Sequence, residues 1–250
     1  MSGGTGSPSP VRGVIFDLWG TLVYRDYGQY EEPNARRLAA WLKDLGLLSE
    51  EEQVSAMLQE IRQEGSRWAE EHHREYTIER AMGELFARLH LPSSDSLLFQ
   101  AVRVFFSPEL QGSRPYPHAR EVLEALSRMG LRLGLISNAT SDWLVHKVLS
   151  QGGLEGYLDP IVSSAAFGWR KPHLAVFRYV LDQWRIPPAQ AVMVGDAVEA
   201  DLVPAQELGM RTILVAVEPN PRNDAYLASF HPDAVVTSLA EIPSVLLALL

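Results

Sequence analysis

Six short apolar runs recur along the chain, and most are continuous Val, Ile and Leu rather than alternating with polar residues. Runs of this length and composition predict strands that are buried on both faces of a parallel sheet. The predicted strands cover residues 11–18, 131–137, 160–163, 191–195, 212–217 and 234–237.

Amphipathic segments lie between these runs, with apolar residues three and four positions apart, as in a helix packed on a core. Gly130 and Gly209 follow two of them and are suitable C-terminal caps. Strands that alternate with helices predict an α/β fold with a doubly wound parallel sheet. The predicted helices of this part cover residues 118–129, 143–149, 173–184 and 201–208.

Residues 33–106 interrupt this alternation, because they contain helical patterns at 35–45, 51–69 and 77–89 but no convincing strand. An ordinary connection between a strand and a helix has roughly 2–6 residues. We therefore predict an inserted all-helical cap at 33–106, a core of 11–32 and 107–250, and a flexible tail at 1–10. The alternative is that these residues form one long connection between the first two strands.

A cap in this position would lie over the carboxyl ends of the strands, where open α/β sheets bind ligands.

Composition narrows the possible functions. The chain has no cysteine, which excludes disulfides, thiolate metal sites and a cysteine nucleophile. A net charge of −9 argues against nucleic-acid binding, which needs clustered Lys and Arg. No apolar run approaches the roughly 20 residues of a membrane span, and the N-terminus does not resemble a secretory signal. We expect a cytoplasmic protein with a small anionic substrate, either a monomer or a homodimer.

Polar residues follow the predicted strands at the points where these strands end. Because parallel strands end at the same edge of a sheet, residues far apart in sequence can meet there. Taken singly, each has an ordinary interpretation as a turn, a helix cap or a solvated surface residue. The residues in question are Asp17, Ser137, Asn138, Lys171, Asp196 and Asp201.

Together these residues form a coherent chemical set. A carboxylate that attacks an anionic centre needs a cation beside it, and Lys171 could supply one. Asp17 and Asp196 could share Mg²⁺, and Asp201 could orient Asp196 or a metal-bound water. The Ser137 hydroxyl could bind the oxygens of the transferred group. Such a site suits phosphoryl transfer or displacement at a carboxylate-bearing carbon.

The segments FDLWGTLV, LISNAT, RKP and VMVGDAVEAD resemble, in order and spacing, the four motifs of the haloacid dehalogenase superfamily. The cap between the first two motifs resembles that of the subfamily with phosphoglycolate phosphatases and 2-haloacid dehalogenases. The resemblance implies a Rossmann-like core in which Asp17 is the nucleophile, Ser137 binds the oxyanion and Lys171 balances charge.

The resemblance also implies the binding residues. The Mg²⁺ ligands would be Asp17, the backbone carbonyl of Trp19, and Asp196, with Asp201 in support. Asn138, Gly20 and Thr21 would contact the substrate.

Trp19 departs from the phosphatase pattern, which usually has a second aspartate there to protonate the leaving group. Indole cannot transfer a proton, and this contribution is typically 10²–10⁴-fold. Tyr24, Asp26 and Tyr27 are candidate replacements, although each is also an ordinary polar loop residue. The dehalogenases of the superfamily also lack this aspartate and have an aromatic residue in its place. They need no acid there, because their halide leaving group needs no proton.

The fourth motif, VGDAVEAD, has the phosphatase form, because its first aspartate is placed for Mg²⁺. We therefore favour a Mg²⁺-dependent phosphatase that forms an aspartyl-phosphate. The alternatives are a 2-haloacid dehalogenase-type hydrolase and a catalytically degenerate binding protein.

Within the cap, a cluster of aromatic and polar side chains is either a solvated helical face or part of the substrate site. If it faces the crevice, Arg74 could bind a substrate carboxylate or second phosphate. The cluster consists of Trp68, His72, His73, Arg74 and Tyr76.

Overall fold

The computed structural model describes residues 10–24, 31–48 and 52–249. A six-stranded sheet with the order β5-β4-β1-β6-β7-β8 forms the core, and all its neighbouring strands are parallel. All six predicted strands are confirmed, with ends that differ by a few residues at most. They are β1 Gly13–Phe16, β4 Arg132–Ser137, β5 Ile161–Ser163, β6 Ala191–Gly195, β7 Arg211–Val215 and β8 Ala234–Val236.

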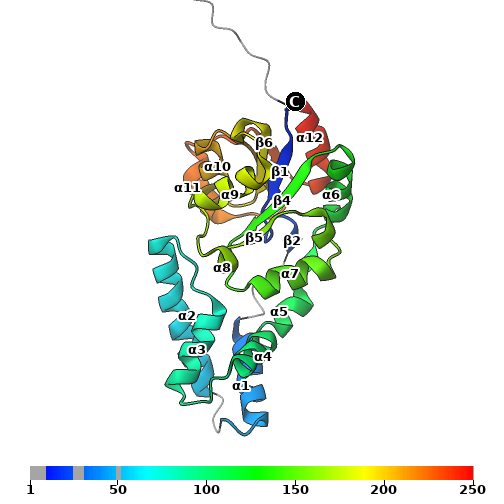
Figure 1. Cartoon of the computed structure of the whole chain (residues 1–250). Helices are drawn as coiled ribbons and strands as arrows, with labels where there is room; N and C mark the ends of the chain where they lie inside the picture. Colours follow the sequence, from blue (N-terminus) through cyan, green and yellow to red (C-terminus); the bar gives the residue numbers. More distant parts are fainter. Residues whose placement is uncertain (1–9, 25–30, 49–51, 250) are drawn as a thin grey trace, which may run out of the picture.

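Helices cover both faces of this sheet, which confirms the doubly wound α/β prediction (Figure 1). The helix predicted at 201–208 is a π-helical turn, Val198–Leu202, followed by a short α-helix. The helices of the core are α6 Ala119–Arg128, α7 Asp142–Gln151, α8 Ser164–Phe167, α9 Ala175–Trp184, α10 Val203–Glu207, α11 Asp224–Leu227 and α12 Ile242–Ala248.

The central strand β1 sends side chains to both layers, since successive strand residues point to opposite faces. Val14 and Phe16 join the apolar cluster formed with α6, α7 and α12. Ile15 joins a second cluster with α9 and α10. All three side chains are fully buried, which explains why this strand reads as a continuous apolar run.

Four helices form the insertion that follows the first strand, and Figure 1 shows them gathered at one end of the molecule, away from the sheet. The cap is defined here as α1 Glu31–Asp44, α2 Glu52–His72, α3 Ile78–Arg88 and α4 Asp95–Phe105. The first three match the predicted helical segments. The fourth was not predicted, although Ser94 caps it and Ala101, Val102 and Phe105 form its buried face.

The two chain segments that flank the cap lie side by side. Strand β2, Val23–Tyr24, precedes the cap, and strand β3, Arg114–Pro115, follows it. The two pair antiparallel in a sheet of their own. Helix α5, Ser107–Gly112, connects α4 to β3 and was not predicted. The predicted limits of the cap, residues 33 and 106, lie within two residues of the start of α1 and the end of α4.

A second connection joins the far end of the cap to the core; we call residues 73–75 and 168–170 the clasp. The amide of Glu75 donates to the carbonyl of Gly168 at 3.1 Å, and the amide of Arg170 donates to the carbonyl of His73 at 3.0 Å. Nearby, the amide of Ile78 donates to the carbonyl of Thr140 at 2.8 Å. The cap is thus bonded to the strand-end loops of the core.

No helix in the described part of the chain is long and apolar enough to cross a bilayer.

Close packing of β1 against α9 gives a stability prediction. A Cβ at Gly13 would lie 2.6 Å from the Trp184 ring, whereas a Cβ at Gly156 would meet nothing within 4 Å. We expect Gly13→Ala to lower the free energy of unfolding by about 1–3 kcal/mol through overpacking. The control Gly156→Ala should change it by less than about 0.5 kcal/mol. Urea unfolding measures both, and equal effects would contradict this account of the packing.

Candidate active site

Three residues from separate strand ends meet in a buried charge cluster. The Lys171 ammonium donates to Oδ1 of Asp17 and to Oδ1 of Asp201, at 2.6 Å in each case. It also donates to the carbonyl of Ile136 at 2.9 Å. The three charged side chains are almost completely buried, at 1–9% exposed. Three fixed acceptors therefore hold one cation at the carboxyl edge of the sheet, where the sequence predicted it.

Asn138 fixes the loop that carries Lys171. Its side-chain amide donates to the carbonyl of Lys171, and its Oδ1 accepts from the amide of Lys171, both at 2.8 Å. The helix that follows Asn138 is capped instead by Ser141, whose hydroxyl accepts from the amide of Leu144. Ser137 and Asn138 are therefore not the caps of this helix.

Asp196 lies beside this cluster and is held by two asparagines that the sequence analysis did not identify. Asn220 Nδ2 donates to Oδ2 of Asp196 at 3.1 Å, and Asn223 Nδ2 donates to its carbonyl at 2.8 Å. Both belong to the loop after β7, so their only sequence signal was a position beyond a strand end. Asp201 accepts from the amide of Ala197 at 3.1 Å, which ties it to the same turn.

Gly20 makes room for Asp196. Its φ is +80°, and a Cβ there would lie 2.6 Å from Oδ2 of Asp196. A side chain would therefore be strained and would displace the carboxylate. Gly20 thus lies beside Asp196 because of its backbone conformation, and its predicted contact with the substrate stays a prediction.

Two buried hydroxyls at this edge have no hydrogen-bond partner among the described residues. They belong to Ser137, the last residue of β4, and to Thr21, in the loop after β1; both residues are fully buried. A buried hydroxyl without a partner costs roughly 1–3 kcal/mol. Such hydroxyls are suited to the oxygens of a bound anion.

Burial shifts the acidity of the cluster. Burial raises the pKa of Asp17 to about 6, against the opposing effect of Lys171. Burial and the charges of Asp17 and Asp201 raise the pKa of Asp196 to about 8. Burial alone would lower the pKa of Lys171, but the two carboxylates outweigh it and raise this pKa above its ordinary value. Lys171 is therefore a permanent cation, and Asp17 is largely ionised at neutral pH.

The acidic residues fit a divalent metal ion. Ligand oxygens of Asp17, Asp196 and Asp201 all lie within 4.8 Å of one another. Three carboxylates face one ammonium, so the cluster is short of positive charge when all are ionised. A hard cation with oxygen ligands would supply it.

Trp19 is 7% exposed and belongs to the apolar cluster that extends beneath the cap. Its backbone forms a bridge with Val23 across the turn that contains Gly20 and Thr21. The indole is thus part of the packing at this position, where phosphatases of the resembled family have an acid.

Arg74 and Tyr24, which were also predicted from the sequence, do not join the cluster. The guanidinium of Arg74 lies 3.8 Å from the centre of the Trp169 ring, and Arg74 is exposed. Tyr24 is 38% exposed and packs against Tyr116, with 5.3 Å between ring centres. Asp26 and Tyr27 lie outside the described residues.

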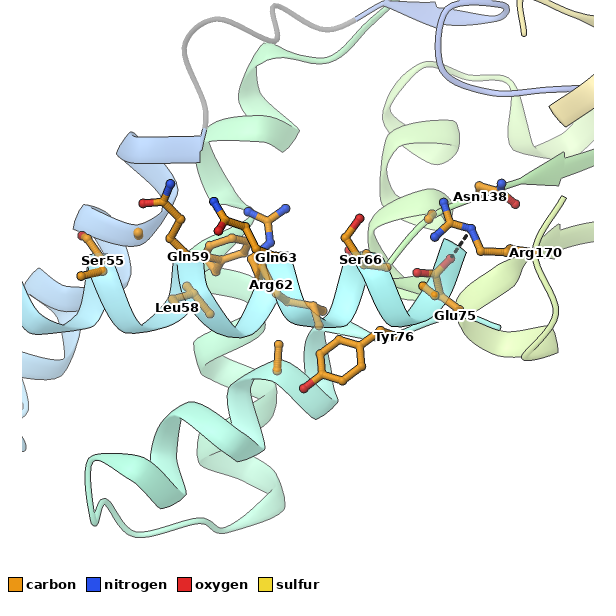
Figure 2. A pocket seen from close by; sticks show the side chains of 18 residues that line it. Ser55, Leu58, Gln59, Arg62, Gln63, Ser66, Glu75, Tyr76, Asn138 and Arg170 are labelled. Carbon is orange, nitrogen blue, oxygen red and sulfur yellow. Dashed lines mark ion pairs between the residues drawn. The ribbon is translucent and has the colours of Figure 1, made fainter. Parts of the chain in front are cut away.

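A cavity of about 750 Å³ separates the cap from the core. Side chains of α2 line it on one side, and Asn138 and Arg170 line it on the other (Figure 2). Arg74 is not among its lining residues; it lines a separate hollow with Trp68, His72 and Trp169. Asn138 connects the cavity directly to the loop of Lys171.

Comparison with known proteins agrees with this geometry. Residues 11–209 match the family model of haloacid dehalogenase-like hydrolases. A glyceraldehyde 3-phosphate phosphatase of Methanocaldococcus jannaschii is 28% identical, over 82% of this chain and 85% of that protein. A ribulose-1,5-bisphosphate 5-phosphatase of Halopiger xanaduensis is 30% identical, over 85% and 87%. The crystal structure of a 2-haloacid dehalogenase from Pseudomonas syringae superposes with a TM-score of 0.68 at 26% identity, covering 95% of this chain and 99% of the other.

The raised pKa values predict a specific pH dependence without metal. The folded protein keeps protons on Asp17 and Asp196 up to about pH 6 and about pH 8, whereas the unfolded chain loses them near the ordinary value of 3.8. In chelator, these two groups should therefore lower the free energy of unfolding as the pH rises from about 4 to 8. Asp196→Asn should remove most of the decrease between pH 6 and 8, as measured by urea unfolding. The control Asp182→Asn, at an exposed position of α9, should keep the wild-type slope.

Proposed function

We propose that this chain, which belongs to the haloacid dehalogenase-like hydrolase family, is a Mg²⁺-dependent phosphatase that acts on a small phosphorylated metabolite. The observation that carries the proposal is the buried cluster of Asp17, Lys171 and Asp201, with Asp196 close enough to share a metal ion. The two phosphatases reported above are similar to this chain over more than four fifths of its length, which supports this choice of chemistry.

The protein's own residues account for the covalent step. Oδ2 of Asp17 would attack phosphorus while Oδ1 stays bonded to Lys171, and the bond between phosphorus and the ester oxygen breaks. The rest of the substrate would leave as an alcohol whose oxygen takes its proton from water, because Trp19 cannot supply one. The unpartnered hydroxyls of Ser137 and Thr21 would bind oxygens of the transferred phosphoryl group. Water then attacks the aspartyl-phosphate, which releases phosphate and restores the Asp17 carboxylate.

Asp17 and Asp196, with the backbone carbonyl of Trp19, would hold Mg²⁺, and Asp201 would support them through Lys171 and the turn at Ala197. When bound, the metal ion supplies positive charge that offsets the repulsion between the nucleophile and the phosphate. Lys171 cannot do this alone, because its ammonium already serves two carboxylates.

A 2-haloacid dehalogenase function is the second candidate, favoured by the aromatic residue at 19 and by the structural similarity to a dehalogenase. Asp196 argues against it. Burial and the neighbouring charge of Asp17 raise the pKa of Asp196, so the two carboxylates repel when both are ionised, and a metal-free enzyme would gain nothing from a second acid next to its nucleophile. A binding protein without activity would have no need to keep both Asp17 and Lys171.

The test is hydrolysis of para-nitrophenyl phosphate with Mg²⁺ and with chelator, alongside halide release from 2-chloropropionate. We expect phosphate release that chelator abolishes, and no halide. Asp17→Asn should lower kcat by about 10³-fold or more, because it removes the nucleophile. Asp182→Asn makes the same chemical change on the surface and should keep wild-type activity.

Chelator-insensitive halide release would establish the second candidate instead. Loss of activity on both compounds in a folded protein would favour the binding protein. Full activity of Asp17→Asn would overturn the assignment of the nucleophile.

Trp19→Asp tests whether the missing acid limits turnover. We expect kcat on glycerol 3-phosphate, whose leaving group needs a proton, to rise about tenfold or more per folded molecule. The same change should lower the free energy of unfolding by about 3–5 kcal/mol, because it removes a buried indole. Kinetics and urea unfolding are measured on the same preparation. Unchanged kcat would mean that proton transfer is not limiting.

A further inference from the structure

We propose that the substrate carries a second anionic group, a carboxylate or another phosphate, which Arg170 binds, and a hydroxylated chain that lies along α2. This inference rests on the proposed phosphatase function and concerns the part of the substrate that does not react. It is argued from the lining of the cavity between the cap and the core.

The size of the cavity fits a whole metabolite. Its volume of about 750 Å³ falls within the 300–1,000 Å³ typical of small-molecule sites. Asn138 is one of its lining residues and holds the loop of Lys171 through two hydrogen bonds. Asp17 does not itself line the cavity, but the Lys171 loop links it to Asn138. A substrate with its phosphate at Asp17 would therefore extend the rest of its molecule toward this space.

The wall that α2 presents to the cavity is mostly polar, although Ala56, Leu58 and Ala69 also line it. Lining side chains recur at intervals of three and four residues, which places them on one side of a helix. Figure 2 shows Gln59, Gln63 and Ser66 projecting from the same side of α2. The opposite side packs inside the cap through Val54 and Ile61, which are almost fully buried. Amides and hydroxyls on the cavity side are suited to the hydroxyl groups of a sugar or polyol.

Arg170 is oriented toward a ligand by a buried acid. Its Nε lies 4.0 Å from Oε2 of Glu75, whose side chain is 3% exposed while that of Arg170 is 22% exposed. The Ser164 hydroxyl donates to the same oxygen at 2.5 Å and accepts from the amide of Ala139 at 2.9 Å. Ser164 therefore fixes Glu75. The ion pair of Glu75 with Arg170, drawn as a dashed line in Figure 2, holds one edge of the guanidinium.

The other edge of this guanidinium has no ion-pair partner among the described residues. A guanidinium presents paired N–H groups that match a carboxylate or phosphate. Lys171, the neighbouring cation, is already committed to Asp17 and Asp201. Arg62 also lines the cavity, but its guanidinium lies 5.5 Å from the centre of the Phe105 ring. Arg170 is thus the cation best placed for a second anionic group.

Two matched pairs of phosphate esters test the proposal. The first is 3-phosphoglycerate and glycerol 3-phosphate, which differ only in a carboxylate and a hydroxymethyl group. The second is fructose 1,6-bisphosphate and fructose 6-phosphate, which differ in a second phosphate. We expect wild type to have a kcat/KM at least about tenfold higher for the more acidic member of one pair or both. Arg170→Gln should lower that ratio by about tenfold or more, as expected for loss of a charged hydrogen bond.

The ratio separates recognition from structural damage, because a disturbed Lys171 loop slows both members of a pair alike. Arg178→Gln, at an exposed position of α9, is the matched control and should keep the wild-type ratio. The pair that responds identifies the second group as carboxylate or phosphate.

Three outcomes would overturn the proposal. Wild type that hydrolyses para-nitrophenyl phosphate but does not discriminate within either pair retains the phosphatase function and contradicts the second anionic group. A ratio that falls in Arg74→Gln and not in Arg170→Gln assigns recognition to the hollow beside Trp169. Absence of hydrolysis of every ester contradicts the proposed function, and this inference with it.

Discussion

The site depends on the hydrogen bonds and ion pairs of one buried group, the ammonium of Lys171. It bonds to Asp17 after β1, to Asp201 after β6 and to the carbonyl of Ile136 in β4, so it links three strands of the sheet at one edge. Removing one member of such a group leaves an uncompensated buried charge, which is strongly destabilising. The same bonds keep Asp17 ionised at neutral pH despite its burial. Fold stability and the charge of the proposed nucleophile thus both depend on the Lys171 ammonium.

The core could be predicted because its signals are local. Continuous apolar runs predict all six strands, and the strand-end rule predicts that Asp17, Lys171 and Asp196 lie at one edge of the sheet, where the structure brings them together. The first three cap helices were recognised in the same way. The fourth was missed, although Ser94 and the apolar spacing to Phe105 carry its signal. The short pair β2 and β3 could not be foreseen, because two residues each give no periodicity.

The residues that line the cavity or support Asp196 were harder to predict. Arg74 was selected from its sequence neighbours, yet the structure places its guanidinium on the Trp169 ring, and Arg170 lines the cavity instead. Asn220 and Asn223 hold Asp196 from a loop more than twenty residues away. Tertiary packing alone decides which side of a loop faces a cavity, and no pattern in a single sequence encodes it. Trp19 lies between these two cases. The sequence alone shows that it replaces the aspartate usual in the resembled phosphatases, but only its burial in the structure shows that the indole contributes to packing.

The clasp has a mechanical consequence. It joins the cap to the loop whose next residue is Lys171, through hydrogen bonds that water must replace whenever cap and core separate. Any separation of cap and core at this point therefore pulls on the segment that carries the Lys171 ammonium. Admission of a ligand and assembly of the charge cluster are thereby mechanically coupled, and a molecule that keeps the two bodies together also keeps the lysine loop in register.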